Sequence, residues 1–302
     1  MRAKPEVYHR GSLALIWDQR MLDAQVALWQ QLGKPGFFAA VLDVLEAVCP
    51  VDSSGLLVFY RQQKPLSLLH RFHPFDRSLH ADIYSTGPYA LDPQYQLFLK
   101  GCQSGTYWLA DVAPDDFYQS SYYTAFYSKI GVADSIDVLW RIDDNTALNF
   151  FMQRNINSNT FSRADVQALN MVMPVLDAAL ARHHQLATPL PLANSSDQTH
   201  LQVETTLSNF ASSLLTPRER DVLWYLLRGY SSALTAEKLQ TSDGTVKIHR
   251  KNIYRKLEIG SQAELFSLFI NCIPFARPGL PEDPLHSYQQ AQEPAGPLSA
   301  PV

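Results

Sequence analysis

Residues 215–257 read LTPRERDVLWYLLRGYSSALTAEKLQTSDGTVKIHRKNIYRKL, and the helix-start and helix-stop signals in this stretch decide how it folds. Thr216 and Glu219 have the spacing of a capping box, with a proline between them at the first helical position. A helix is therefore expected to begin here. Gly229 follows the last apolar residue of that helix and is expected to end it.

Two further helices are expected before Leu257. Ser231 or Ser232 begins a short one, a tight turn follows at 240–241, and Ser242 caps a longer one that runs to Leu257. Two helices joined by so short a turn form a helix-turn-helix. A fourth helix follows, because Ser261-Gln-Ala-Glu264 is a second capping box, and its apolar residues cover more than one face. Such a surface needs a packing partner.

The helix that begins at Ser242 has an outward face suited to duplex DNA. Lys247 and Lys251 are four residues apart and share one face with Ile248 between them. Lysine reaches guanine acceptors in the major groove, and an aliphatic side chain contacts the thymine methyl group. The residues that flank this face suit phosphate contacts and comprise Thr245, Arg250, Tyr254 and Arg255. The alternative is an ordinary solvated basic face, which charge alone would favour.

Charge is divided unequally along the chain. The 302 residues carry a net charge of −4, yet residues 215–267 hold nine Lys/Arg against six Asp/Glu, which is +3. The remainder therefore carries −7. A basic module beside an acidic partner domain is typical of a nucleic-acid-binding protein with a regulatory domain.

The segment resembles the LuxR-type helix-turn-helix family of bacterial regulators. The matching residues are Leu215-Thr-Pro-Arg-Glu219, Val222-Leu223, Gly229, Ala236, Leu239, Ser242, Thr245-Val-Lys247, His249, Asn252-Ile-Tyr254 and Lys256-Leu257. The resemblance implies a double-stranded DNA operator, base-facing positions at Lys247, Ile248 and Lys251, and a homodimer formed through the last helix. RNA polymerase is an expected partner if the protein is an activator. Thr235 departs from the family, which normally has an aliphatic residue there.

The N-terminal part has the element order of an α/β domain. Its expected elements are helices at 15–32 and 37–48, strands at 55–61, 66–72, 135–142 and 146–153, and a helix at 162–183 capped by Ser162. This order predicts an α-β-α sandwich of the GAF or PAS type at 1–185. We expect a linker at 186–214, the all-α four-helix DNA-binding domain at 215–272 and a proline-rich, disordered tail at 273–302.

Aromatic residues are concentrated between Tyr107 and Tyr127, where eight fall within 21 positions. So many ring hydroxyls need polar partners or a ligand, so we expect an aromatic-lined pocket. The alternative is that the rings close the core or form a dimerisation or protein-interaction surface without a small ligand.

A second, looser resemblance supports the pocket. Asp92-Pro93, Trp108 and Phe126-Tyr-Ser-Lys-Ile-Gly131, followed by two strands, are similar to the autoinducer-binding domain of LuxR-type quorum sensors. The resemblance implies that Asp92 accepts a hydrogen bond from a ligand N–H or pairs with an amine, and that Trp108 walls the pocket. The expected ligand contacts are Tyr84, Asp92, Trp108, Tyr122 and Phe126.

Other functions find little support in the sequence. No nucleophile elbow, phosphate loop or paired catalytic carboxylates are evident, so we expect no enzyme and no cofactor. His70, His73 and His80 fit no zinc spacing, so no metal is expected. No apolar run suits a signal peptide or a membrane span, so we expect a soluble cytoplasmic protein with no membrane partner.

Overall fold

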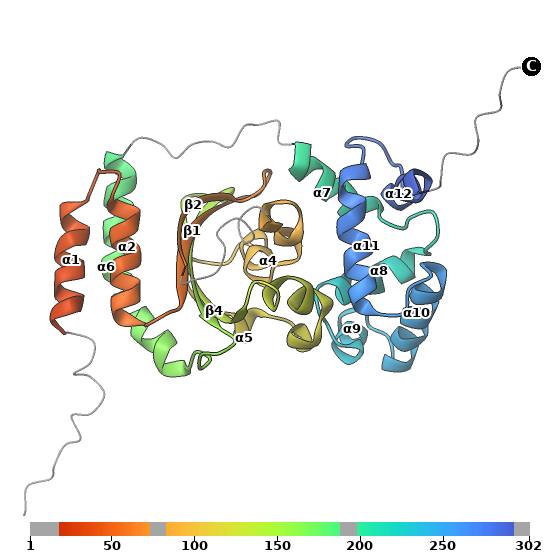
Figure 1. Ribbon diagram of the computed structural model, residues 1–302, viewed down its shortest axis with the longest axis horizontal. Helices are drawn as coiled ribbons and strands as arrows, with labels where there is room; N and C mark the ends of the chain where they lie inside the picture. The colour runs from red at the N-terminus through yellow and green to blue at the C-terminus, as the bar shows by residue number, and fades with distance from the viewer. Residues whose placement is uncertain (1–17, 73–82, 188–197, 293–302) are drawn as a thin grey trace, which may run out of the picture.

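The computed structural model describes residues 18–72, 83–187, 198–292 of the chain. Three sets of elements follow one another along its long axis (Figure 1). Helices α1, α2 and α6 lie at one end, a sheet and short helices in the middle, and helices α7 to α12 at the other end. The two ends of the described chain therefore lie on opposite sides of the sheet.

The sheet has five antiparallel strands in the order β2-β1-β5-β4-β3. They are β1 (Ser53–Tyr60), β2 (Leu66–Phe72), β3 (Gly105–Trp108), β4 (Val132–Arg141) and β5 (Thr146–Asn155). The four predicted strands are confirmed, whereas β3 was missed because it has only four residues. Strands β4 and β5 are joined by the Asp143-Asp144-Asn145 turn, as the sequence indicates.

Both faces of the sheet are buried, and alternating residues separate them. On β4, Ile136 and Val138 point to a cluster shared with the outer helices, whereas Leu139 belongs to the cluster on the other face. The outer layer consists of α1 (Gln19–Gln30), α2 (Phe37–Val48) and α6 (Arg163–Leu186). The predicted capping box of Ser162 and Asp165 starts α6. These features confirm the α/β sandwich.

The inner face of the sheet is covered by short elements. They are η1 (Pro88–Leu91), α4 (Pro93–Leu99), α5 (Leu109–Val112), η2 (Phe117–Gln119) and the π-helical turn η3 (Tyr123–Tyr127). Five of the eight aromatic residues of the cluster lie in η2 and η3, and of these Phe117, Phe126 and Tyr127 are buried. Unlike the outer layer, this layer also contacts the C-terminal helices.

The C-terminal domain contains the expected helices α8 (Pro217–Leu227), α9 (Ser232–Lys238), α10 (Asp243–Lys256) and α11 (Gln262–Cys272). Thr216 and Glu219 form the predicted capping box of α8. Gly229 ends that helix with a φ of 84°, a conformation that favours glycine. Ser231, Ser242 and Ser261 cap the next three helices.

Two predicted irregular segments contain helices. Within the predicted linker, α7 (Gln198–Asn209) is helical and buries Val203, and within the predicted disordered tail, α12 (Pro284–Gln292) buries Leu285. Asp283 holds the tail in place, because its carboxylate accepts hydrogen bonds from the backbone N–H groups of Ala211 and Ser213 at 2.9 and 3.0 Å. Composition predicted disorder, but tertiary contacts order both segments.

Helix α9 carries a buried polar group that has no partner. Thr235 is fully buried, and its Oγ1 has no hydrogen-bond partner among the described residues. Thr206 on α7 is equally buried, but its Oγ1 donates to the carbonyl oxygen of Gln202 at 2.8 Å. An unsatisfied buried hydroxyl destabilises the folded state, whereas a satisfied one contributes to stability.

Replacing each threonine by valine is expected to have opposite effects. Thr235→Val should raise the free energy of unfolding by about 1 kcal/mol because the unpaired hydroxyl is lost, and Thr206→Val should lower it by about 1 kcal/mol because a hydrogen bond is lost. Urea denaturation of the full-length protein measures both. Destabilisation by Thr235→Val would contradict the assignment of an unsatisfied hydroxyl.

Candidate functional site

A cavity lies against the inner face of the sheet, beneath η3. The volume of the cavity is about 50 Å3. Lining residues come from the strands, from η3 and from the segment before α4, and comprise Leu57, His70, Tyr84, Asp92, Phe126, Tyr127, Ile130, Ser135, Asp137, Asn149, Phe151 and Gln153. Apolar walls that carry a few converging polar groups are typical of a small-molecule site.

Asp92 caps α4 and lines the cavity. One carboxylate oxygen accepts from the backbone N–H of Gln94 at 2.8 Å, and the other accepts from the hydroxyl of Tyr84 at 2.9 Å. Burial raises the pKa of Asp92 to about 6, although both hydrogen bonds act in the opposite direction. A third hydrogen bond comes from the backbone of Tyr95, which leaves about one of the four lone-pair sites of the carboxylate for a ligand donor.

A second buried carboxylate, Asp137, lines the same cavity from β4. It accepts hydrogen bonds from the Ser135 hydroxyl at 2.5 Å and from the Asn149 side-chain amide at 2.7 Å. Burial raises the pKa of Asp137 to about 7; the charge of Asp92 adds to this effect, and the hydrogen bonds from Ser135 and Asn149 oppose it. The cavity therefore holds two carboxyl groups whose charged forms are disfavoured by burial.

Asn149 offers one more acceptor. Its side chain is 1% exposed, and its Oδ1 has no hydrogen-bond partner among the described residues. Its side-chain amide nitrogen donates a hydrogen bond to Asp137. This bond identifies Oδ1 as the acceptor atom that points away from Asp137. Buried polar groups are normally paired, so an orphan acceptor in a cavity wall indicates a missing donor.

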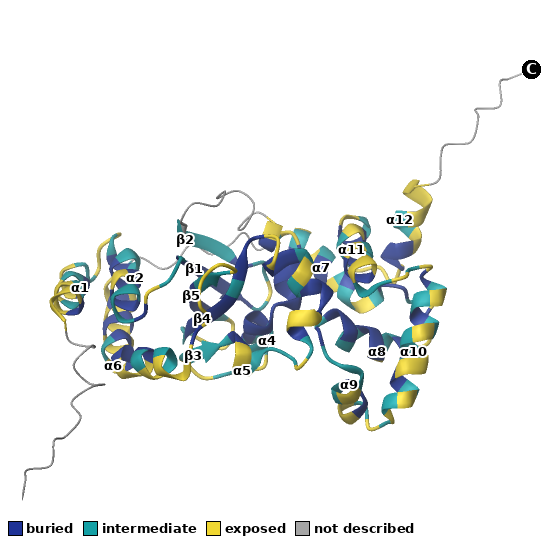
Figure 2. Cartoon of the chain, turned by 60° about the horizontal axis from the view of Figure 1, so that its bottom comes forward, coloured by how far each residue is buried: buried dark blue, intermediate teal, exposed yellow. Residues whose placement is uncertain are grey.

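Aromatic rings connect the cavity to the DNA-binding domain. Phe126 lines the cavity, and Tyr122 stacks on it with ring centroids 5.7 Å apart. The other side of Tyr122 packs edge-on against Phe266 of α11, again at 5.7 Å. A single apolar cluster contains all three rings, so the two domains share one continuous core. Figure 2 shows the buried residues extending from the sheet to α11.

Polar contacts reinforce this interface. Asp115 accepts from the backbone N–H and hydroxyl of Ser231, the cap residue of α9, at 3.0 and 2.5 Å. Although burial works against its charge, these hydrogen bonds lower the pKa of Asp115. At Gly229 a side chain would meet the Cα of Phe117 at 3.0 Å, so the backbones approach closely there.

The structure brings together some of the expected ligand contacts. Tyr84, Asp92 and Phe126 line the cavity, and Tyr122 lies directly behind Phe126. Trp108 does not line the cavity, contrary to expectation. Its Nε1 donates to both carboxylate oxygens of Asp134, at 3.0 and 2.9 Å.

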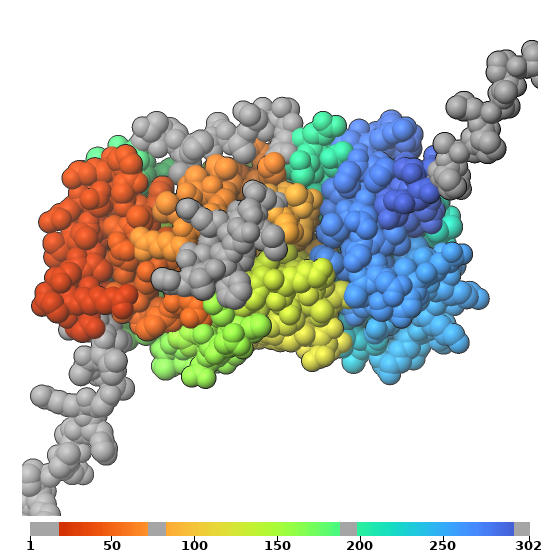
Figure 3. All heavy atoms as spheres, in the orientation of Figure 1, coloured from red at the N-terminus to blue at the C-terminus, as the bar shows by residue number. Residues whose placement is uncertain are grey.

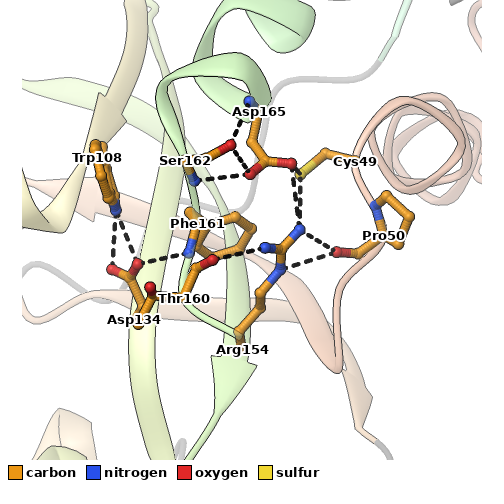
Figure 4. A network of polar contacts seen from close by, with 9 residues as sticks. All are labelled: Cys49, Pro50, Trp108, Asp134, Arg154, Thr160, Phe161, Ser162 and Asp165. Atoms are coloured by element: carbon orange, nitrogen blue, oxygen red, sulfur yellow. Dashed lines mark hydrogen bonds and ion pairs between the residues drawn. The ribbon is translucent and has the colours of Figure 1, made fainter. Parts of the chain in front are cut away.

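Trp108 has a structural role on the other side of β4. As Figure 4 shows, Asp134 also accepts from the backbone N–H of Phe161, while Arg154 pairs with Asp165 at the start of α6. Trp108 thus helps to attach α6 to the sheet. β3 places its indole beside Asp134 because Trp108 pairs with Ile136 in the sheet register.

Sequence reasoning missed the polar strand residues of the cavity. Ser135 and Asp137 alternate along β4 with residues of the outer cluster, and Asn149 lies diagonally across from Asp137 on β5. The signal available was an acidic residue in an otherwise apolar strand. Its partner on the next strand became evident only from the sheet register. Of the three histidines considered for metal, His70 lines the cavity, and His73 and His80 lie outside the described residues.

The expected DNA-facing residues share the outer side of α10. Lys247, Ile248 and Lys251 are exposed, with Ile248 62% exposed, while Val246 and Ile253 are buried in the domain core. Helix α10 packs mainly against α8 and α9 and lies at the outer end of the molecule (Figure 3).

The flanking residues have local contacts that orient them. Lys247 pairs with Asp243 at 2.7 Å, and the guanidinium of Arg250 lies over the Tyr254 ring at 5.4 Å. The backbone N–H of Thr245 donates the cap hydrogen bond to the hydroxyl oxygen of Ser242, and Arg255 is exposed in the last turn. Lys256 turns inward to Glu219 at 2.6 Å, which ties α10 to the first turn of α8.

Residues 213–269 match the family model described as bacterial regulatory proteins, luxR family. None of the helices in the described part of the chain is long and apolar enough to cross a membrane. Among solved structures, the ligand-binding domain of VqsR from Pseudomonas aeruginosa is 22% identical, with a TM-score of 0.48, covering 56% of this chain and 99% of that one.

Two curated proteins illustrate the sequence similarity. The response regulator TodT of Pseudomonas putida is 47% identical over 51 residues, 17% of this chain and 22% of TodT. A protein of Aeromonas salmonicida, named an HTH-type transcriptional regulator in the exeN 3′ region, is 34% identical over 185 residues, 60% of this chain and 93% of that protein. The chain belongs to the luxR family of bacterial regulatory proteins.

Proposed function

We propose that this DNA-binding transcriptional regulator is controlled by a small molecule held in the cavity of its N-terminal domain. The observation that carries the proposal is the cavity itself, which contains buried, charged and unpaired acceptors and contacts the DNA-binding domain through Tyr122. Groups of this kind destabilise an empty site and become favourable when a ligand pairs with them. Binding energy is thereby available to shift the conformation of the domain interface.

For DNA recognition we propose that α10 enters the major groove. Lys247, Ile248 and Lys251 would contact base edges, because they are exposed together on its outer side. Thr245, Arg250, Tyr254 and Arg255 would contact phosphates and fix the register of the helix. A homodimer on a two-fold-related operator is part of this proposal.

Control would act through helix α11. By family resemblance this helix is the dimer contact, yet here Leu265, Phe266 and Phe269 are buried against the rest of the same chain. The sequence predicted that the apolar surface of this helix needs a packing partner. Other residues of the same chain supply that partner. A ligand that moves η3 would change the contact between Tyr122 and Phe266 and alter the availability of α11 for dimerisation.

The alternative was a protein-interaction platform without a small ligand. It needs exposed aromatic residues, but Phe117, Tyr122 and Tyr127 are almost fully buried. Of the aromatic cluster, Tyr118 is 39% exposed, which is too little for a contact patch. Burial of the cluster favours the small ligand.

The DNA-reading face is tested by alanine substitutions. Lys247→Ala and Lys251→Ala should each weaken binding to an operator selected from random-sequence DNA, by roughly 5- to 150-fold if each lysine contacts a base. Arg255→Ala should weaken binding to all sequences and reduce the salt dependence by about one charge. Mobility-shift titrations at two salt concentrations measure both effects.

Lys129→Ala provides the control, since it removes an exposed lysine of the N-terminal domain. If Lys247→Ala and Lys251→Ala both left sequence-specific binding unchanged, the DNA-reading face would be assigned wrongly.

Domain docking is tested at Asp115. Asp115→Ala removes the acceptor for Ser231, so the DNA-binding domain should dock less firmly and the interface should be cleaved faster in limited proteolysis. Because the contact lowers the pKa of Asp115, its stabilising effect is present at neutral pH and is lost as the pH falls through that lowered value. Asp116→Ala is the matched control, because the Asp116 side chain has no hydrogen bond to the described residues. Equal cleavage rates for both variants would exclude a docking role.

A further inference from the structure

We infer that the cavity binds a small organic cation, a primary amine with an apolar substituent, held by Asp92, Asp137 and Asn149. The inference rests on the proposed function and names its ligand class. All three side chains line the cavity and are at least nine-tenths buried.

The charge of the cavity favours a cationic ligand. Asp92 and Asp137 lie in one cavity, and no lysine or arginine is among the described residues that line it. Isolated buried carboxylates are costly unless a cation pairs with them, and the one basic side chain among the described residues of the lining is His70. Burial raises the pKa of both carboxyl groups, which is the response expected of acids that lack a cation. An ammonium group would let both ionise.

The hydrogen-bond acceptors in the cavity wall independently favour a ligand that donates hydrogen bonds. The Oδ1 of Asn149 has no partner within the ranges that the structure describes, and its amide nitrogen already donates to Asp137. Tyr84 and Ser135 also use their hydroxyl protons on the two carboxylates. Asp92, Asp137 and Asn149 therefore offer only acceptors, so a ligand group that pairs with these three side chains must be a donor. A primary ammonium group supplies three N–H donors and a positive charge at one point.

The remaining walls define the rest of the ligand. Phe126, Tyr127, Ile130, Leu57 and Phe151 give the cavity an apolar and aromatic lining. Aromatic faces stabilise a nearby cation and also pack against an alkyl or aryl substituent. A metal ion is a poorer fit, because no group of three His, Cys, Asp or Glu in the described ranges is arranged to hold one.

The test uses matched compounds on the full-length protein. Hexylamine and 2-phenylethylamine are compared with 1-hexanol, 2-phenylethanol, hexanoate and phenylacetate by thermal unfolding and titration calorimetry. We expect the amines to raise the melting temperature and to bind at least about tenfold more tightly than the alcohols or acids of similar skeleton. Equal or tighter binding of an alcohol or acid, or stabilisation by Mg2+ or Ca2+ but by no amine, would overturn the inference.

Variants locate the binding. Asp137→Asn and Asp92→Asn should each weaken amine binding about ten- to hundredfold, the worth of a charge-assisted hydrogen bond. Asparagine still caps a helix, so Asp92→Asn preserves the start of α4, and Asp137→Asn removes a buried charge and should leave the ligand-free melting temperature undiminished. Asp144→Asn is the control, because Asp144 lies in the turn after β4 and is fully exposed. Undiminished amine affinity in both cavity variants would refute the assigned site.

The outcomes separate the inference from the function on which it rests. If a neutral or anionic compound binds the cavity and changes operator affinity, control by a small molecule stands and the amine is wrong. If no compound of any charge stabilises the protein, both fail.

Discussion

The packing of Tyr122 between Phe126 and Phe266 is the interaction on which the arrangement of this protein depends. It joins the wall of the cavity to the helix that follows the DNA-binding face, at centroid distances of 5.7 Å on both sides. Tyr122 is fully buried, and its hydroxyl has no hydrogen-bond partner in the described part of the chain. The ring therefore occupies this position because of its apolar contacts, and the stability of one domain depends on contact with the other.

This contact gives a physical reason for regulation. Close-packed interfaces shift between discrete arrangements rather than deforming gradually, so a small movement at η3 can become a change in domain docking. The element that lies between the cavity and α11 is the π-helical turn at Tyr123–Tyr127, and single π-helical turns are frequent at functional sites. The cavity, the turn and α11 thus form one connected unit.

Local signals explain why much of the fold was predictable. Capping boxes at Thr216 and Ser162 and the glycine at 229 act within one helical turn, so the sequence alone locates these helix ends. The strands β1, β2, β4 and β5 were predictable from apolar and alternating residues for the same reason. The helices at 198–209 and 284–292 were not, because contacts such as that of Asp283 with Ala211 join residues 72 positions apart.

The residues of the candidate site also divide into those that the sequence alone identifies and those that only the fold brings together. Asp92 was predicted from the resemblance of Asp92-Pro93 to the autoinducer-binding domain, whereas Asp137 and Asn149 meet only through the β4–β5 register. Trp108 was misplaced because one-dimensional spacing does not tell which side of a short strand an indole will face, and Asp134 attracts it away from the cavity. Residues on the outer face of α10 were identifiable because helical periodicity separates them from the buried Val246 and Ile253.

The central claim is that the cavity and α11 respond together. Amide hydrogen exchange of the full-length protein, with and without a saturating cavity ligand, measures this response residue by residue. Coupled domains should show altered protection at 123–127 and also at 262–272. A change confined to residues that line the cavity, with α11 unaffected, would contradict the account.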